Sequence, residues 1–187
     1  MKALFKQLLH GLSCAVSFLP ALTAGFGKSD AGFGFWAQAY SLIPGLPGDY
    51  LRTAYYSLTL AKFHPTARIS FLSFFSHSDC SVEEGVYIGA QCILSRCTIG
   101  SGTHIASGVQ IVAGNAHLRL PDGSLRREAE RTPPTRIGRQ VWIGAEAVVM
   151  NEILDGATIA AGAVVTRPVP AGAVVGGVPA KQLAPRG

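Results

Sequence analysis

Aliphatic residues recur at intervals of six along the second half of this 187-residue chain. The recurring positions are Val82, Ile88 and Leu94, then, after a slip of one residue, Ile93, Ile99, Ile105 and Ile111, then Ile137, Ile143 and Val149, and finally Ile153, Ile159 and Val165. An interval of six is too long for helical periodicity and too regular for ordinary strand alternation. The spacing therefore predicts a solenoid of short strands joined by tight turns.

A second rule accompanies the first, because a small or β-branched residue stands four places after most of the aliphatic ones. These residues are Val86, Cys92, Cys97, Thr103, Val109, Val141, Ala147, Ala157 and Ala163. In a solenoid the aliphatic residue turns inward and the small one lies near a corner, while stacked coils pair about 4.8 Å apart. On this interpretation Cys92 and Cys97 fill corners and have no redox or metal role.

Charge and composition limit the partners of the chain. Hydrophobic residues make up 48% and charged residues 14% of the sequence, and the formal net charge is +5. That charge suits phosphates, a nucleotide-bearing cofactor or an acidic membrane face. No nucleic-acid motif accompanies it, so we expect no nucleic-acid partner. The four cysteines form no CxxC pair and no metal-ligand spacing with histidine, which predicts a reduced cytoplasmic protein without a metal.

The N-terminal segment allows more than one interpretation. Between Lys6 and Lys28 lie twenty-one residues without Asp, Glu, Lys or Arg. A cleaved signal would use Lys2 and Lys6 as its basic region and end near Ala24. A transmembrane helix is less favoured, because glycine and proline interrupt the run. We favour an amphipathic helix that packs on the domain or lies at the inner face of a membrane.

A long insertion interrupts the repeat between Ile111 and Ile137, where the interval is twenty-six residues. The inserted segment, about 112–136, does not fit a coil and must protrude, and long loops on rigid scaffolds are usually functional. It carries His117, whose imidazole, with an unperturbed pKa of about 6.5, suits proton transfer at neutral pH. A solvated loop histidine is the alternative. We expect a helical segment over 1–62 and the solenoid over 63–187.

The hexad pattern and the C-terminal stretch VTRPVPAGAVVGGVPAK (165–181) resemble the hexapeptide-repeat acyltransferases. The resemblance covers roughly residues 65–181, and it implies a triangular left-handed parallel β-helix, an all-β solenoid. Residues 1–62 resemble the helical leader of polysaccharide-type sugar O-acetyltransferases. The string IASGVQIVAGNAH resembles the segment before the catalytic histidine of maltose and galactoside O-acetyltransferases, and His117 is the matching residue.

This resemblance implies a function, which is acetyl-CoA-dependent transfer to a sugar hydroxyl in polysaccharide or glycoconjugate biosynthesis. His117 would be the general base of a direct transfer without an acyl-enzyme. Homotrimers with active sites between neighbouring β-helices are general in the family. The positions expected to contact the acyl donor are Trp142, Gly144, Ala145, Ala161, Gly162 and Lys181.

Other assignments stay open at the level of sequence. His104 is the alternative base. Asp79, Glu83 and Glu84 are candidates to orient the imidazole, although a solvated corner charge is the favoured interpretation of each. The acceptor is a sugar hydroxyl or, alternatively, the amine of an amino sugar or other small molecule. A non-catalytic trimerisation scaffold is a third function, but a scaffold gains nothing from a histidine-bearing insertion.

Overall fold

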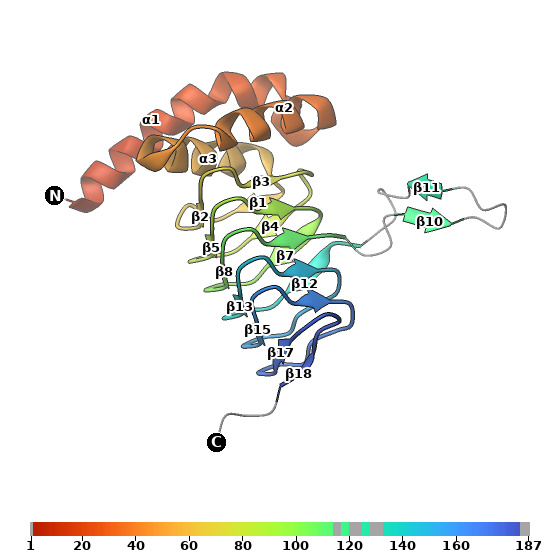
Figure 1. Ribbon diagram of the computed structural model, residues 1–187. Helices are drawn as coiled ribbons and strands as arrows, with labels where there is room; N and C mark the ends of the chain where they lie inside the picture. The colour runs from red at the N-terminus through yellow and green to blue at the C-terminus, as the bar shows by residue number, and fades with distance from the viewer. Residues whose placement is uncertain (1, 114–116, 120–124, 128–132, 184–187) are drawn as a thin grey trace.

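The computed structural model describes residues 2–113, 117–119, 125–127 and 133–183, while the side chains of residues 2–8 and of the two inserted strands lie outside that description. Helices lie across one end of a stack of short-stranded coils, and the chain ends at the opposite end (Figure 1). Among the described helices, none is long and apolar enough to cross a membrane.

The helical part consists of α1 (Lys2–Thr23), the 3-10 turn η1 (Gly25–Gly27), α2 (Asp30–Ser41) and α3 (Gly45–Thr59). The Ser29 hydroxyl caps α2 by accepting a hydrogen bond from the Gly32 amide at 3.2 Å. Helix α1 has no acid in its first turn and no base in its last. Its stability therefore depends on packing, and Ser17 and Ala21 are fully buried on the side that contacts α3.

Arg52 of α3 joins the helices to the first coil. Its fully buried side chain donates from Nε to the Ile69 carbonyl at 3.0 Å and from Nη1 to the carbonyls of Tyr40 and Ile43 at 2.9 and 2.7 Å. Nη2 contacts Asp49 Oδ1 at 2.7 Å. Burial lowers the pKa of Arg52 and the Asp49 carboxylate raises it. One charged group thus satisfies three buried carbonyls from two parts of the fold.

Replacing Arg52 with methionine keeps an unbranched stem but removes every donor to those carbonyls. We expect Arg52→Met to lower the free energy of unfolding by about 3–5 kcal/mol, as for a broken buried charge network. Lys62→Met, which removes an exposed ion pair with Glu83 at 2.8 Å, is the control. It should cost at most about 1 kcal/mol. Urea denaturation followed by circular dichroism measures both, and equal losses would contradict the linking role of Arg52.

The stack has three faces, each a sheet of parallel strands, and we call them A, B and C. Face A contains β1 (Lys62–Phe63), β4 (Ser81–Val82), β7 (Cys97–Ile99) and β12 (Thr135–Ile137). Face B contains β2 (Arg68–Ile69), β5 (Tyr87–Ile88), β8 (His104–Ile105), β13 (Trp142–Ile143), β15 (Thr158–Ile159) and β17 (Val174–Gly176), and ends with antiparallel β18 (Lys181–Gln182). Face C contains β3 (Phe74–Phe75), β6 (Ile93–Leu94), β9 (Gln110–Ile111), β14 (Val148–Val149) and β16 (Val164–Val165).

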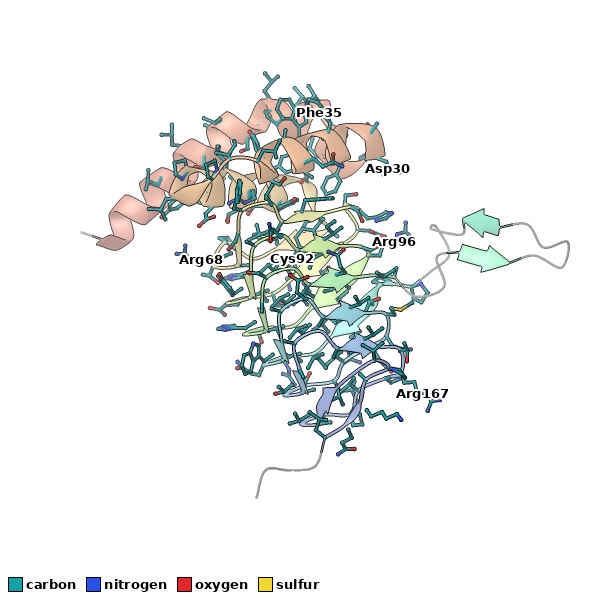
Figure 2. All side chains as sticks on the ribbon, in the orientation of Figure 1. Asp30, Phe35, Arg68, Cys92, Arg96 and Arg167 are labelled. Carbon is teal, nitrogen blue, oxygen red and sulfur yellow. The ribbon has the colours of Figure 1, made fainter. Side chains whose placement is uncertain are left out.

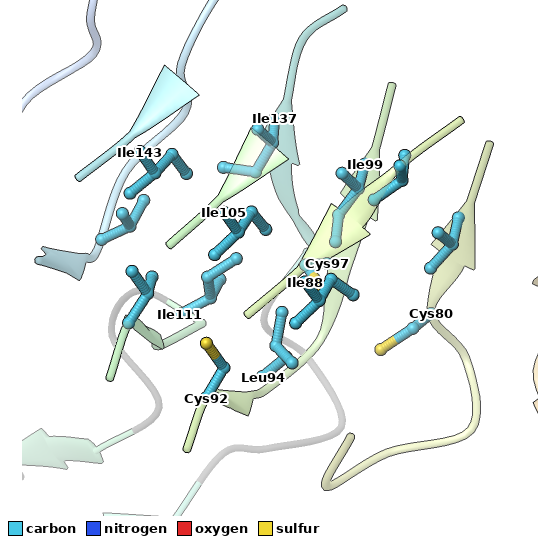
Figure 3. Close-up of a cluster of buried hydrophobic side chains, with 14 of the residues drawn as sticks. Cys80, Ile88, Cys92, Leu94, Cys97, Ile99, Ile105, Ile111, Ile137 and Ile143 are labelled. Atoms are coloured by element: carbon cyan, nitrogen blue, oxygen red, sulfur yellow. The ribbon is translucent and has the colours of Figure 1, made fainter. Parts of the chain in front are cut away.

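Inward aliphatic side chains stack in register from coil to coil. On face B, Ile88, Ile105, Ile143 and Ile159 are successive partners, and each is at most 1% exposed. Figure 3 shows the first three in the packed interior together with isoleucines from the other faces. The six-residue interval is therefore the length of one face plus one corner.

Ile93 does not belong to the inward series, so its predicted phase is wrong. Its side chain points outward and is 39% exposed, whereas Leu94 is fully buried and the next inward residue is Ile99. The corner between faces C and A is one residue shorter at this point. In the sequence this shortening makes two neighbouring residues fit the interval of six, because Leu94 follows Ile88 by six residues and Ile93 precedes Ile99 by six.

The small residues predicted at the corners are all buried, and Figure 3 shows Cys80, Cys92 and Cys97 among the inward isoleucines. All three are thiols without a disulfide. Burial raises the pKa of Cys92, and a hydrogen bond with Cys80 together with burial raises the pKa of Cys97. Since the thiolate is the reactive form, these two residues are packing groups and poor nucleophiles.

Candidate active site

The insertion leaves the stack at the edge where face C meets face A. Its two ends are held together, because the Val112 amide donates to the Val149 carbonyl at 2.9 Å and the Thr135 hydroxyl donates to the Val112 carbonyl at 3.3 Å. Ala113, the last residue described before the gap, is buried. The coils above and below therefore stack without interruption although the chain departs and returns between them.

Two strands within the insertion, β10 (His117–Arg119) and β11 (Leu125–Arg127), form an antiparallel hairpin in which His117 pairs with Arg127. Figure 1 shows this hairpin standing away from the stack, beside β7 and β12. His117 thus opens the first strand of the protruding hairpin. Its side chain lies outside the described residues, so its role as the base remains a prediction.

The predicted donor residues gather at a different edge, between faces B and C. Gly144 and Ala145 follow β13, while Ala161 and Gly162 follow β15 one coil further on. The Gly144 amide donates to the Ile159 carbonyl and the Gly162 amide donates to the Ala145 carbonyl, each at 2.8 Å. These four residues form one continuous strip of tiny side chains, which we call the small-residue column.

Lys181 lies at the end of this column. Strand β18 pairs Lys181 with Gly176, the last residue of β17. Gly176 comes directly after Val175, which is in register with Ile159 and Ile143, just as Gly144 comes directly after Ile143. The lysine is exposed. A cation at the end of a strip of small residues is suited to a phosphate group on an extended ligand.

The two glycines of the column have different structural demands. A Cβ atom on Gly144 would lie 2.5 Å from the Ala161 amide nitrogen, so a side chain there would push the next coil away. A Cβ atom on Gly162 would meet nothing within 4 Å, although its φ of +67° favours glycine. Gly144 is therefore needed for coil spacing, and Gly162 faces open space beside exposed Ala161.

Trp142 lies on the outer surface of face B, 60% exposed. It is the strand partner of His104, which is in turn the partner of Tyr87. The rings of Tyr87 and His104 are 6.0 Å apart. His104 therefore lies within strand β8, on the outer surface of face B. These three residues form an exposed aromatic row next to the small-residue column.

Two of the three candidates for orienting the base, Asp79 and Glu83, form ion pairs. Asp79 contacts Arg96 at 3.0 Å and Glu83 contacts Lys62 at 2.8 Å. Glu84 is exposed at the following corner. No group of three or more His, Cys, Asp or Glu residues in the described part of the chain is placed to hold a metal ion.

A pocket of about 390 Å³ on face A is a feature that sequence reasoning missed. Ser81, Thr98 and Arg136 line it from three successive strands, and Arg139 and Asp155 line it from the adjoining corner. The hexad pattern contains the signal for it, because the residue before each inward aliphatic points outward. Arg136 belongs to β12, so the pocket adjoins the end of the insertion.

Arg139 and Asp155 form a bidentate contact at the rim of this pocket. The guanidinium donates from Nε and Nη2 to Asp155 Oδ2 at 3.0 and 2.9 Å, and the Arg139 amide donates to Oδ1 at 2.9 Å. These hydrogen bonds lower the pKa of Asp155, and the one from the Arg139 backbone amide has the largest effect. The carboxylate is thus ionised at neutral pH, and the pocket presents hydroxyl, guanidinium and carboxylate groups together.

Sequence comparison relates this chain to acetyltransferases, although no family model matches it. It is 37% identical over 109 residues to a chloramphenicol acetyltransferase of Morganella morganii, covering 49% of this chain and 50% of that protein. It is 38% identical over 108 residues to nodulation protein L of Rhizobium meliloti, covering 54% and 57%. An N-acetyltransferase of Staphylococcus aureus that acts on 2,3,4,5-tetrahydropyridine-2,6-dicarboxylate is 40% identical over 88 residues, covering 46% and 32%. The chain spans about half the length of these relatives, or less.

Two solved structures share the fold over most of both chains. A maltose O-acetyltransferase from Clostridium difficile superposes with a TM-score of 0.65 at 20% identity, covering 83% of this chain and 87% of that one. A hexapeptide-repeat acetyltransferase from Vibrio cholerae gives 0.65 at 21% identity, covering 84% and 92%. The predicted left-handed parallel β-helix is thereby confirmed. The predicted resemblance to the hexapeptide-repeat acyltransferases is confirmed as well.

The spacing role of Gly144 is open to test through alanine variants. Gly144→Ala should lower the free energy of unfolding by about 1–3 kcal/mol, because the methyl group overpacks the contact with the next coil. Gly162→Ala has open space and should cost only the backbone strain, about 1 kcal/mol. Urea denaturation compares the two. A Gly144→Ala variant as stable as the wild type would show that the coils tolerate a side chain there.

Proposed function

We propose that this protein is an acyltransferase that moves the acetyl group of acetyl-CoA to a sugar hydroxyl, in polysaccharide or glycoconjugate biosynthesis. The observation that carries the proposal is the interruption of a continuous β-helix by a hairpin that begins with a histidine. The acetyltransferase relatives and the two structural neighbours support the same chemistry. A purely structural scaffold would leave the hairpin without a purpose.

The proposed reaction needs one proton acceptor. A sugar hydroxyl is protonated at neutral pH, so the His117 imidazole takes its proton as the oxygen attacks the thioester carbonyl. The tetrahedral intermediate then collapses, the carbon–sulfur bond breaks, and the imidazolium returns the proton to the departing thiolate. No acyl-enzyme forms, in keeping with the packing role of the buried cysteines.

The small-residue column is the proposed site for the pantetheine arm of the donor. Its backbone at Ala161 and Gly162 is exposed and has no large side chain in the way. Trp142 would flank the arm, Gly144 and Ala145 would supply the strip beneath it, and Lys181 would meet a phosphate of the nucleotide.

The separation of the two edges supports an active site shared between chains. In one chain the hairpin leaves from the edge between faces C and A, whereas the column lies between faces B and C. Face C stands between them. A homotrimer brings the hairpin of one chain to the column of the next, because a head-to-tail contact closes under threefold symmetry.

The acceptor is assigned to the pocket on face A. Ser81 and Thr98 supply hydroxyl groups and Arg136 supplies a guanidinium, which are suited to a polyhydroxylated molecule. The N-acetyltransferase relative favours a second candidate, transfer to an amine. A thiol-release assay with matched hydroxyl and amino sugars separates the two.

Acyl-CoA supply and the unpaired thiols suit the reducing cytoplasm, which is the proposed location.

His117→Ala removes the proposed base and should lower the rate of thiol release from acetyl-CoA at least about 100-fold. The native mass should be unchanged, because the hairpin stands outside the stack. His64→Gln, at a corner far from both edges of the proposed site, is the control and should retain activity. If His117→Ala kept full activity, or if activity were lost only in His104→Ala, the base would be a residue other than His117.

A mixing experiment tests the shared site independently of the assay for the base. Ala161→Trp should inactivate the enzyme, since the residue is exposed and an indole there would cover the surface proposed for the donor. Co-expression of His117→Ala and Ala161→Trp chains should restore about a quarter of wild-type activity, because that fraction of random interfaces combines an intact hairpin with an intact column. A mixture as inactive as either variant would place the whole site in one chain.

A further inference from the structure

Between residues 9 and 22, every exposed residue of α1 is apolar. Its exposed residues include Leu12, Ala15, Val16, Phe18, Leu19 and Leu22. Leu12 and Leu19 expose 65% and 64% of their surface. Soluble proteins rarely expose a continuous apolar strip of this kind without a partner for it. We call these six residues the outer face of α1.

Neighbouring elements extend this surface. Phe26 of η1 packs against Phe18 with ring centroids 5.8 Å apart, and both rings are exposed. Phe35 of α2 is exposed as well, and Figure 2 shows it projecting from the helical end of the molecule, away from the coils. Trp36 Nε1 donates to the Thr23 hydroxyl at 2.8 Å, which fixes α2 against the end of α1. The exposed rings are therefore held on a rigid support.

The charged residues of the segment 1–29 all have one sign. Residues 1–29 contain no Asp or Glu, whereas Lys2 and Lys6 precede the apolar run and Lys28 follows it. The first acid is Asp30, in the first turn of α2. Lysines at both ends of an apolar helical face attract an anionic surface, and each contributes while it lies close to that surface.

The position of the helices leaves the outer face accessible to a flat partner. Figure 1 shows α1 lying across the end of the stack, with the coils and the inserted hairpin on the other side of α3 or to the side. The side of α1 turned away from the coils is therefore open to a flat partner. The edges assigned to the active site stay clear of it.

We propose that the outer face of α1 binds the surface of an anionic phospholipid bilayer, with the helix lying in the plane of the interface. The leucine, valine and phenylalanine side chains enter the boundary between headgroups and acyl chains, and the net positive charge of residues 1–29 favours an anionic lipid surface. A second copy of the chain fits this face less well, because parallel or antiparallel pairing would bring lysine-bearing ends together without an acid from residues 1–29. The inference does not depend on the proposed acyl transfer.

Co-sedimentation of the full chain with lipid vesicles tests this binding. The wild type should sediment with vesicles of equal parts phosphatidylglycerol and phosphatidylcholine, and much less with phosphatidylcholine alone. The Leu12→Gln, Leu19→Gln double variant should bind at least about tenfold more weakly, because two large apolar groups lose their burial. Lys28→Gln should weaken binding to the anionic vesicles alone, and added salt should have the same effect.

Val174→Gln is the matched control, since it replaces an exposed aliphatic residue at the opposite end of the stack. It should bind vesicles like the wild type, and all variants should keep the wild-type circular dichroism and thiol-release rate. A wild type that ignores both vesicles, or that binds both equally, would overturn the proposal. A double variant that keeps vesicle binding would overturn it as well. If the double variant also has half the native mass of the wild type while lipid binding is unchanged, the outer face of α1 contacts a second copy of the chain.

Discussion

The stacking of inward aliphatic side chains is the interaction on which the rest of the structure depends. Each coil contributes about one such residue to each face, and parallel pairing places it directly on its counterpart in the next coil, as Ile105 does between Ile88 and Ile143. A strand of two residues has little stability of its own, so the coils persist only because each covers its neighbour. The small corner residues permit this stacking, because larger ones would not leave room for the turn.

The insertion uses the rigidity of this stack without disturbing it. Val112 and Thr135 are hydrogen-bonded at the edge. The strand before the hairpin, β9, still pairs with β14 on face C, and the strand after it, β12, still pairs with β7 on face A, as in an uninterrupted coil. A protruding hairpin gains a fixed base in this way. The same geometry separates the hairpin from the small-residue column, which is why the proposed active site is shared between chains.

The helical segment depends on the stack through a different kind of contact. Tyr56 of α3 packs on Phe63 and Phe75 with ring centroids 5.8 and 5.1 Å away, and the Tyr56 hydroxyl accepts a hydrogen bond from the Phe75 amide. Together with Arg52, these rings seal the open end of the first coil, which would otherwise expose its interior. Helix α1 packs on this seal with one side only. Its apolar outer face is therefore a consequence of where the helices sit.

Sequence alone determined the periodic features, because a repeat states its own geometry many times over. The six-residue interval, the small corner residues and the break at 112–136 were sufficient to predict a parallel β-helix with a protruding segment. The tertiary structure decided what depends on contacts between distant residues: the outward direction of Ile93, the pocket formed by Ser81, Thr98 and Arg136, and the buried bonds of Arg52. It also decided that the hairpin and the small-residue column lie at different edges of the stack. A pattern fixes the distance between residues along the chain, whereas the edge on which a residue stands depends on how every preceding corner has turned.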